Sequence, residues 1–383
     1  MGILRTNTLS GIGTNGPVFD GVTRFDTQGY FVPPPGTTDQ RSAGITTTQG
    51  AIRFNTDSQK LEFYAQDQWF EMVIDTPALG TSSNTGAGAR GVFVGGGTPT
   101  RSSAIDYVNI SSTGNSISFG TLTESRSDAA ACASSTRGVF GSGSPTGPAA
   151  SNTIDFVTIA STGNAQDFGD LTRQDEPIGA CSNATRGLWV GGTNQPTGTG
   201  KNIIDYITIA STGNAVDFGD LVIPRSYVTA CASSTRGLVG NSGEFSPANY
   251  YNNIDYITIS TLGNAADFGD LNISVRNGTA CANSTRGIFA GGTTPGGVVN
   301  NICFVTISSL GNAVKFGDLT LARDSFSSAS SAIRGLFAAG TTPSINNTID
   351  YITILTQGNA IDFGDLSAAK FGSEGTSNGH GGL

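Results

Sequence analysis

The sequence predicts an all-β protein: a six-bladed β-propeller that follows a small β-rich N-terminal region. An Arg-Gly pair followed by an apolar run recurs six times, every 47 to 50 residues, and a fixed period of this length is typical of propellers and solenoids. Each repeat contains four short segments, and no stretch of the chain has a convincing helical period. Four short antiparallel strands per repeat make one propeller blade.

The four segments of a repeat differ in residue size, and this difference predicts their order in the blade. The first segment is small, as in Ala230–Ala232, and the second is an apolar run closed by glycines, as in residues 187–192. The third alternates and is β-branched, as in Ile204–Ile209, and the tight-turn signal Gly213-Asn214 leads to a fourth segment around Phe218-Gly219-Asp220. Because blades converge on an axis, we expect the small segment innermost and the aromatic residues further out.

Length, charge and hydropathy limit the classes of function. The 383 residues allow one large and one small domain, which we place at residues 78–383 and 1–77. The net charge is −9 and no basic patch occurs, which argues against a nucleic-acid partner. Residues 1–11 lack a signal-peptide pattern, and no apolar run reaches transmembrane length. We therefore expect a protein made in a cytoplasm, without membrane insertion.

The five cysteines do not indicate a disulfide framework or a metal site. Cys132, Cys181, Cys231 and Cys281 each lie five residues before an Arg-Gly pair, so they occupy one position of the repeat, whereas Cys303 lies elsewhere. Equivalent positions in neighbouring blades should exceed the ~7 Å between Cα atoms that a disulfide allows. No CxxC or histidine accompanies them. We expect all five to be reduced and to fill apolar space.

Catalytic chemistry has little support in the sequence. The one histidine, His380, rules against a histidine triad or cluster, and it aligns with Thr185 of another repeat, which favours a structural role. Two aspartate positions recur in most repeats, as at Asp205 and Asp220, whereas a catalytic carboxylate pair should be unique. We expect these aspartates to accept hydrogen bonds from turns and backbone, with calcium binding as the weaker alternative. The sequence thus predicts no catalytic residue, metal or cofactor.

The arginine of each Arg-Gly pair has two interpretations. The six are Arg90, Arg137, Arg186, Arg236, Arg286 and Arg334. They could form a ring that binds an anionic glycan, or each could pair with an aspartate of its own or the next blade. Acidic residues are equally periodic, which favours pairing.

The loops between the second and third segments vary most among the repeats. Binding on a rigid scaffold usually resides in such loops. The fourth loop is the most aromatic and contains Phe245, Tyr250 and Tyr251, which we take as the candidate binding loop. Packing against a neighbouring loop is the competing explanation for these aromatic residues.

A β-hairpin is predicted within the N-terminal region. Ile52 and Phe54 alternate with polar residues, as do Leu61 and Phe63, and residues 56–60 form the turn. A lone hairpin is marginally stable in water. We therefore expect its apolar face to pack on Trp69 and on another chain, and we take these five residues as the candidate attachment hairpin.

The repeat resembles the kelch family. Arg225, Gly291-Gly292, Tyr256 and Phe268 match the basic residue, the double glycine, the tyrosine and the outer aromatic position of its motif. The resemblance covers about residues 85–383. The outer residue is Phe rather than Trp, and the double glycine is degraded in the second, fourth and sixth repeats.

Strings such as IDYITIASTGNAVDFGDL at residues 204–221 resemble repeat-containing structural proteins of tailed phages, especially marine cyanophages. This resemblance implies a non-enzymatic virion protein, a fibre, appendage or decoration protein of tail, neck or capsid. It also implies attachment to other virion proteins through residues 1–77 and a homo-oligomer, with a trimer favoured. The alternative is an adhesin whose propeller loops bind a host surface glycan.

Two segments compete for the innermost strand of the first blade. Gly375–Leu383 aligns in register with Ala180–Leu188, and Thr81–Ala89 directly precedes Arg90. We favour the C-terminal segment, because it would pin both ends of the chain and cover an exposed sheet edge.

Overall fold

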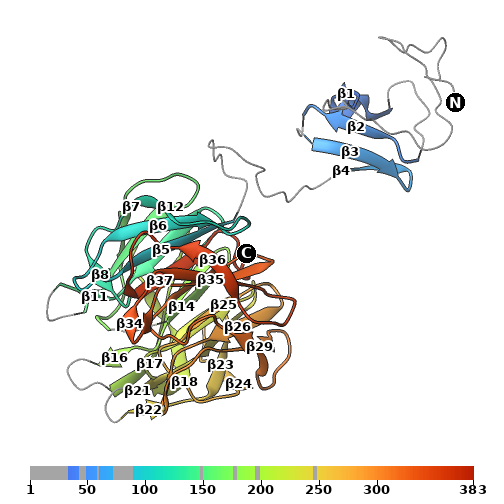
Figure 1. Ribbon diagram of the computed structural model, residues 1–383. Coiled ribbons are helices and arrows are strands. Elements are labelled where there is room, and N and C mark those ends of the chain that lie inside the picture. Colours follow the sequence, from blue (N-terminus) through green and yellow to red (C-terminus); the bar gives the residue numbers. More distant parts are fainter. Residues whose placement is uncertain are drawn as a thin grey trace, which may run out of the picture. The chain divides into compact units, whose positions relative to one another are not determined.

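The protein is all-β, as predicted. The computed structural model describes residues 33–42, 49–57, 60–71, 89–146, 150–175, 179–194, 199–244 and 248–383 (Figure 1). Among these residues every regular element is a β-strand except one 3-10 helix, η1 (Thr38–Ser42). The chain divides into two compact units, Met1–Asp75 and Thr76–Leu383.

The N-terminal unit contains a four-stranded sheet in the order β1-β2-β3-β4. Its strands are β1 (Pro35–Gly36), β2 (Ile52–Asn55), β3 (Lys60–Ala65) and β4 (Gln68–Glu71). β2, β3 and β4 are antiparallel neighbours, and β1 pairs with β2 in parallel. The predicted hairpin is β2 and β3, in which Ile52 lies opposite Phe63 and Phe54 opposite Leu61.

The second unit contains, in its described residues, six large antiparallel sheets, one for each Arg-Gly repeat. We number them 1 to 6 and call the first strand given for each its inner strand. Sheet 1 is formed by β37 (Phe371–Ser377), β5 (Arg90–Gly97), β6 (Ala104–Asn109) and β7 (Ile117–Thr121). Sheet 2 is formed by β9 (Ala130–Ala133), β10 (Arg137–Gly141), β12 (Thr153–Thr158) and β13 (Gln166–Asp170). Sheet 3 is formed by β14 (Gly179–Ser182), β15 (Arg186–Val190), β17 (Thr199–Thr208), β18 (Val216–Arg225) and the short β16 (Thr193–Asn194).

The remaining large sheets repeat this plan. Sheet 4 is formed by β19 (Thr229–Ala232), β20 (Arg236–Gly240), β23 (Asn253–Thr258) and β24 (Ala266–Asp270). Sheet 5 is formed by β25 (Thr279–Ala282), β26 (Arg286–Ala290), β29 (Asn301–Thr306) and β30 (Val314–Asp318). Sheet 6 is formed by β31 (Ser327–Ser330), β32 (Arg334–Ala338), β35 (Thr348–Thr353) and β36 (Ile361–Asp365).

Small two-stranded sheets lie where the second and third strands of a repeat connect. They are β8 (Arg126–Ser127) with β11 (Ser144–Pro145), β21 (Gly243–Glu244) with β22 (Asn249–Tyr250), β27 (Thr293–Thr294) with β28 (Gly297–Val298), and β33 (Thr341–Thr342) with β34 (Ser344–Ile345). β8 itself precedes the inner strand of sheet 2, whereas the other seven strands lie within these connections. Bridges such as Arg276 to Thr293 and Asp324 to Thr341 tie the segments before the inner strands to these connections. We call this end of the sheets the loop end.

The inner strands of sheets 2 to 6 consist of small residues, as predicted, because the inner strands approach one another closely, whereas β37 also contains Phe371 and Glu374. Each contacts the next in the order β9, β14, β19, β25, β31, β37, and β37 contacts β9. Serine side chains join neighbours: the hydroxyls of Ser182 and Ser330 each donate to a carbonyl of the preceding inner strand, on Ala133 and Ala282, at 2.8 Å. Larger side chains could not occupy these contacts without moving the strands apart.

The apolar core lies between neighbouring sheets rather than within one of them. One cluster joins Val92 and Ile105 of sheet 1 to Phe140 and Val157 of sheet 2. A comparable cluster joins Phe93 of sheet 1 to residues of sheet 6. Burial of apolar surface between faces is the main force that holds such sheets together.

The repeated cysteines explain why glycine follows arginine in sheets 3 to 6. All five cysteines are free and buried, as expected. A Cβ atom at Gly187 would lie 2.6 Å from Sγ of Cys132, and one at Gly237 would lie 2.9 Å from Sγ of Cys181. Only glycine leaves room for the cysteine sulfur of the preceding sheet. The glycine after the arginine and the cysteine of the neighbouring inner strand therefore fit each other in size.

The Gly-Asn pair has a different role from the predicted tight turn. Seven residues separate β17 from β18, so Gly213-Asn214 does not form a two-residue hairpin turn. Instead the Asn214 side chain accepts a hydrogen bond from the backbone N–H of Asp170 in the preceding sheet, at 3.0 Å. A Cβ at Gly169 would lie 2.5 Å from the Gly213 carbonyl oxygen, so the glycine of Phe-Gly-Asp permits this approach.

The C-terminal segment supplies the inner strand of sheet 1, as favoured from the sequence. β37 lies beside β5 (Figure 1). Thr376 lies opposite Val92, and Ser377 lies opposite Gly91. Cys181 and Ser182 of sheet 3 occupy the same register, opposite Leu188 and Gly187. Residues 81–88 of the competing segment lie outside the described residues.

Candidate functional site

The arginines of the Arg-Gly pairs join neighbouring sheets through backbone carbonyls, which corrects the predicted pairing with aspartate. Each NH1 donates to an isoleucine carbonyl at the end of the third strand of the next sheet, at 2.8 to 3.1 Å. The pairs are Arg90 to Ile159, Arg137 to Ile209, Arg186 to Ile259, Arg236 to Ile307, Arg286 to Ile354, and Arg334 to Ile110. The last of these joins sheet 6 to sheet 1.

Each of these guanidinium groups also stacks on an aromatic ring of its own sheet. The distances from the guanidinium carbon to the ring centroid are 4.4 to 5.0 Å. With one face against a ring and NH1 bound to a carbonyl, the six groups fit a structural role better than the glycan-binding ring considered from the sequence.

The aspartates of the third strands pair instead with basic residues close before the inner strands. Arg126 and Asp155 are 2.9 Å apart, as are Arg323 and Asp350, and all four side chains are buried. Arg225 pairs with Asp255 in the same way, and burial lowers the pKa of this arginine while Asp255 opposes the shift. The expected backbone bonds also occur, since Asp155 accepts from the Thr123 N–H at 3.2 Å.

Sheet 5 lacks this ion pair, and both partners are replaced together. Val275 occupies the position of Arg225, and Cys303 occupies the position of Asp255. Both side chains are 2% exposed and belong to one apolar cluster. This replacement explains why Cys303 does not share the position of the other four cysteines.

At the loop end, one position near the start of the inner strand carries a different residue in each repeat. Asp128, Tyr227, Asn277, Ser325 and Gly372 occupy one position of the repeat and have φ values of +52° to +61°. Backbone hydrogen bonds of 2.7 to 3.0 Å link Asp128 to Gly372, Gly372 to Ser325, and Ser325 to Asn277. The frame is repeated, but each sheet adds a different side chain to it.

A cavity of about 50 Å³ opens among these residues, which we call the loop-end pocket. Asp128, Tyr227, Asn277, Ser325 and Glu374 line it. Burial raises the pKa of Glu374 to about 8, and the charge of Asp128 adds to the shift. Burial also raises the pKa of Asp128. Carboxyl, amide, hydroxyl and aromatic groups thus converge on a small polar space.

An arginine and two tyrosines lie beside this pocket. The Arg276 guanidinium carbon lies 5.3 Å from the ring centroid of Tyr227 and 4.8 Å from that of Tyr250. Tyr251 is half-buried, and burial together with Glu244 raises its pKa. Of the candidate binding loop, Tyr250 therefore shares the Arg276 side chain with Tyr227 of the pocket, whereas Phe245 lies outside the described residues.

Sequence reasoning missed Tyr227, Arg276, Asp128 and Glu374. No family model and no curated protein matches the chain. A comparison among the chain's own repeats could have found Tyr227, because its equivalents are Asp, Asn, Ser and Gly in four other sheets. Among the described residues no group of three or more His, Cys, Asp or Glu could hold a metal ion. None of the described helices is long and apolar enough to span a bilayer.

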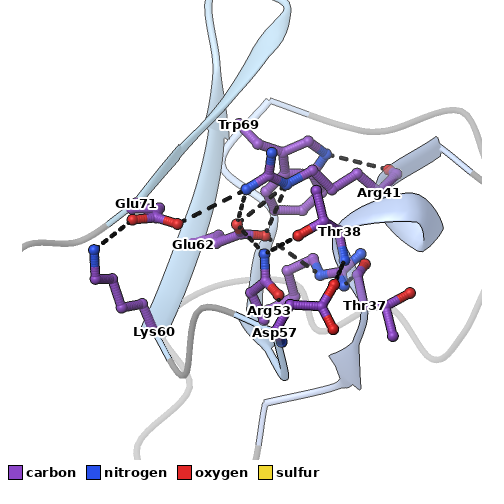
Figure 2. A network of polar contacts seen from close by, with 10 residues as sticks. Thr37, Thr38, Arg41, Arg53, Asp57, Lys60, Glu62, Trp69 and Glu71 are labelled. Carbon is purple, nitrogen blue, oxygen red and sulfur yellow. Dashed lines mark hydrogen bonds and ion pairs between the residues drawn. The ribbon is translucent and has the colours of Figure 1, made fainter.

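The N-terminal sheet has a polar face that is covered by η1. Glu62 is fully buried and pairs with Arg41 of η1 (Figure 2). It also accepts a hydrogen bond from the Asn55 side chain at 2.7 Å. Burial would raise the pKa of Glu62, but the bonds from Arg41 and Asn55 hold it below its usual value. Trp69 donates to the Arg41 carbonyl at 3.2 Å from the same face.

The opposite face of this sheet is apolar and corrects part of the predicted attachment hairpin. Ile52, Phe54, Leu61 and Phe63 share it, as expected, but Phe70 completes it instead of Trp69. The rings of Phe63 and Phe70 stack with centroids 5.4 Å apart. Ile52 is 49% exposed and the other four are partly exposed, so this apolar face offers a contact surface.

Proposed function

We propose that this chain is a non-enzymatic structural protein of a virus particle, and that its six sheets are the blades of a closed kelch-type propeller. The role in a particle rests on the resemblance of strings such as residues 204–221 to phage structural proteins, and the closed propeller rests on the order of contacts between the sheets. Inner-strand contacts and arginine–carbonyl bonds run from each sheet to the next and from sheet 6 to sheet 1. The repeated arginines thus connect neighbouring sheets through hydrogen bonds and stabilise the second unit.

Attachment to the particle is assigned to residues 1–77 and to the apolar face of the N-terminal sheet. A small sheet with one partly exposed apolar face gains stability when it packs on another chain. A homo-oligomer, with a trimer favoured, would satisfy this face, and contacts with other virion proteins would satisfy it equally well.

Two measurements test this assignment. Mass spectrometry of virions purified from the encoding virus should detect the chain, and its absence from particles would refute the proposal. Mass photometry of the full-length chain should give a trimer. Leu61→Asp should reduce it to monomers, whereas Gln66→Asp, at an exposed turn, should not. A stable wild-type monomer would contradict the oligomer.

A second function is favoured by the loop-end pocket: recognition of a carbohydrate on a host surface. Sugars are bound by aromatic faces together with a few carboxylate and amide groups that fix their hydroxyls. Tyr227, Asn277, Asp128 and Glu374 supply these groups, and Arg276 with Tyr250 extends the surface beside them.

The repeat supplies substitutions that keep the backbone of this pocket. Tyr227→Asn introduces the residue found at the same position and φ in sheet 5, and Arg276→Ser introduces the residue found in sheets 2 and 4. Each should weaken binding to host lipopolysaccharide at least about tenfold, equivalent to about 1.4 kcal/mol. Leu262→Ala, at an exposed site on a connection of the third and fourth strands, should bind as wild type. Equal binding by all four proteins would exclude the pocket as the site.

A further inference from the structure

The last five residues cross the end of the inner strands that lies opposite the loop end. β37 belongs to sheet 1, yet the residues after it reach the other sheets. The N–H of Gly381 donates to the Ala282 carbonyl of sheet 5 at 2.9 Å. Nε2 of His380 lies 2.9 Å from the Ala133 carbonyl of sheet 2 and 3.3 Å from the Ser182 hydroxyl of sheet 3. We call Gly379–Leu383 the strap.

The glycines of the strap allow it to lie against backbone atoms. A Cβ at Gly382 would be 1.9 Å from the Ser182 carbonyl oxygen, and one at Gly381 would be 2.3 Å from the Asn283 carbonyl oxygen. Beneath the strap is a second cavity of about 50 Å³, which residues of all six inner strands line together with His380 and Gly381. The strap therefore closes one side of this axial cavity.

The hydrogen bonds of His380 determine its protonation state. The N–H of Gly382 donates to Nδ1 at 3.1 Å, so Nδ1 carries no hydrogen. Nε2 then carries the hydrogen and donates it to the Ala133 carbonyl. A second proton would have to bind at Nδ1, where it would face the N–H of Gly382 and leave two donors opposed.

We propose that the strap is a pH-sensitive closure of the axial cavity, held in place by neutral His380 and released when this imidazole is protonated. The loss of the Gly382 bond on protonation is the switch. Without this bond, the strap is held only by its remaining contacts, such as the bond of the Gly381 N–H to Ala282 and the contact of His380 with Ser182.

The lining of the axial cavity, among the described residues, contains no group that is mostly anionic in neutral or acidic solution. The other titratable groups lining this cavity, among the described residues, are Glu374 and the four repeated cysteines. Burial raises the pKa of Glu374 to about 8 and those of Cys181 and Cys281 to about 12, so these groups are mostly uncharged below pH 7. Burial lowers the pKa of His380 from its usual 6.5, although its bond to Ala133 opposes the shift.

The sign of the effect follows from this lowered pKa. The released histidine binds a proton below about pH 6.5, whereas the held one binds it only at lower pH, so falling pH favours release. The imidazole alone should raise the opening constant by up to about tenfold between pH 7.5 and pH 5.5. Glu374, whose pKa burial raises to about 8, acts in the opposite direction if release hydrates it, so the test is made in Glu374→Gln protein.

The single histidine of the chain makes the test direct. NMR of protein labelled with ¹⁵N-histidine should show one imidazole with its hydrogen on Nε2 and a pKa below 6.5. In Glu374→Gln protein, hydrogen exchange at Gly381 and Gly382, corrected for intrinsic rates, should lose protection at pH 5.5 relative to pH 7.5, by up to about tenfold. Adding His380→Gln, which keeps a donor and an acceptor without titrating, should abolish this change with pH. An imidazole pKa at or above 6.5, or the same pH dependence in His380→Gln, would overturn the proposal.

Discussion

Deletion of residues 367–383 should lower the melting temperature by at least about 10 °C. The deletion removes β37 and exposes the edge of β5, including Phe93, which is fully buried in the intact protein. It also removes Ser367 and Lys370, both of which bind Asp106. The chain ends of the second unit thus meet in one sheet, and the deletion separates them.

The loss of Lys370 sets the scale of this effect. Its ammonium lies 3.0 Å from an Asp106 carboxylate oxygen, and Lys370 is 1% exposed. A buried charge left without its partner costs about 3 to 5 kcal/mol. For a unit of about 300 residues, about 1 kcal/mol corresponds to some 1.5 °C, so this loss alone lowers the melting temperature by about 5 to 8 °C. The lost strand bonds and apolar contacts add to this, which brings the expected decrease to at least about 10 °C.

Two variants separate the strand from its neighbours. Truncation after Asn378 keeps β37, the Lys370 pair and the Asn378 side chain that accepts from the Arg90 N–H, but it removes the strap. We expect it to melt within a few degrees of wild type. Lys370→Met removes only the charge and should give an intermediate loss. Calorimetry of the three proteins checks the order, and an unchanged melt after deletion of residues 367–383 would show that β5 needs no partner.

The register of β37 could be predicted from sequence because the repeat carries it. Gly375–Leu383 has the spacing of a small inner strand followed by a turn, and five other copies define that spacing. The partners of the arginines could not be predicted in this way. A backbone carbonyl is present at every residue, so it leaves no mark in the sequence, whereas the aspartates are periodic and conspicuous.

The alternation of apolar and polar residues predicted the two faces of the N-terminal hairpin, but it did not predict which residue of β4 joins each face. Trp69 and Phe70 are adjacent, so a shift of one residue exchanges them between faces. The sequence does not determine that register, because both residues are aromatic. The loop-end pocket depends on side chains from different repeats, and their proximity follows only from the arrangement of the sheets.

Sheet 5 lacks the buried ion pair of the other sheets, so substitutions at its two positions can measure how strongly such a pair is coupled. Val275 and Cys303 replace an arginine and an aspartate together, which suggests that either charge alone would be costly at this site. Replacement of a buried ion pair by apolar residues is often neutral or stabilising, whereas loss of one partner is not. The chain therefore contains both tolerated combinations of the same two positions.

Cys303→Asp alone should reduce the free energy of unfolding by about 3 to 5 kcal/mol, because its carboxylate would be buried against Val275. Val275→Arg alone should cost a similar amount, about 3 to 5 kcal/mol. The double variant recreates the pair of sheet 4 and should recover most of either loss, with a coupling energy of at least about 3 kcal/mol. Urea unfolding of the four proteins gives this coupling directly.

Lys315 requires a control, because it lies opposite Cys303 on β30 and could reach a new carboxylate there. The cycle is therefore repeated with Lys315→Gln, which should increase the cost of Cys303→Asp. Cys303→Ala removes the sulfur without adding charge and should cost about 1 to 2 kcal/mol, well below Cys303→Asp. If the effects of Cys303→Asp and Val275→Arg simply add, the two positions do not interact, and the ion pairs of the other sheets would need another explanation.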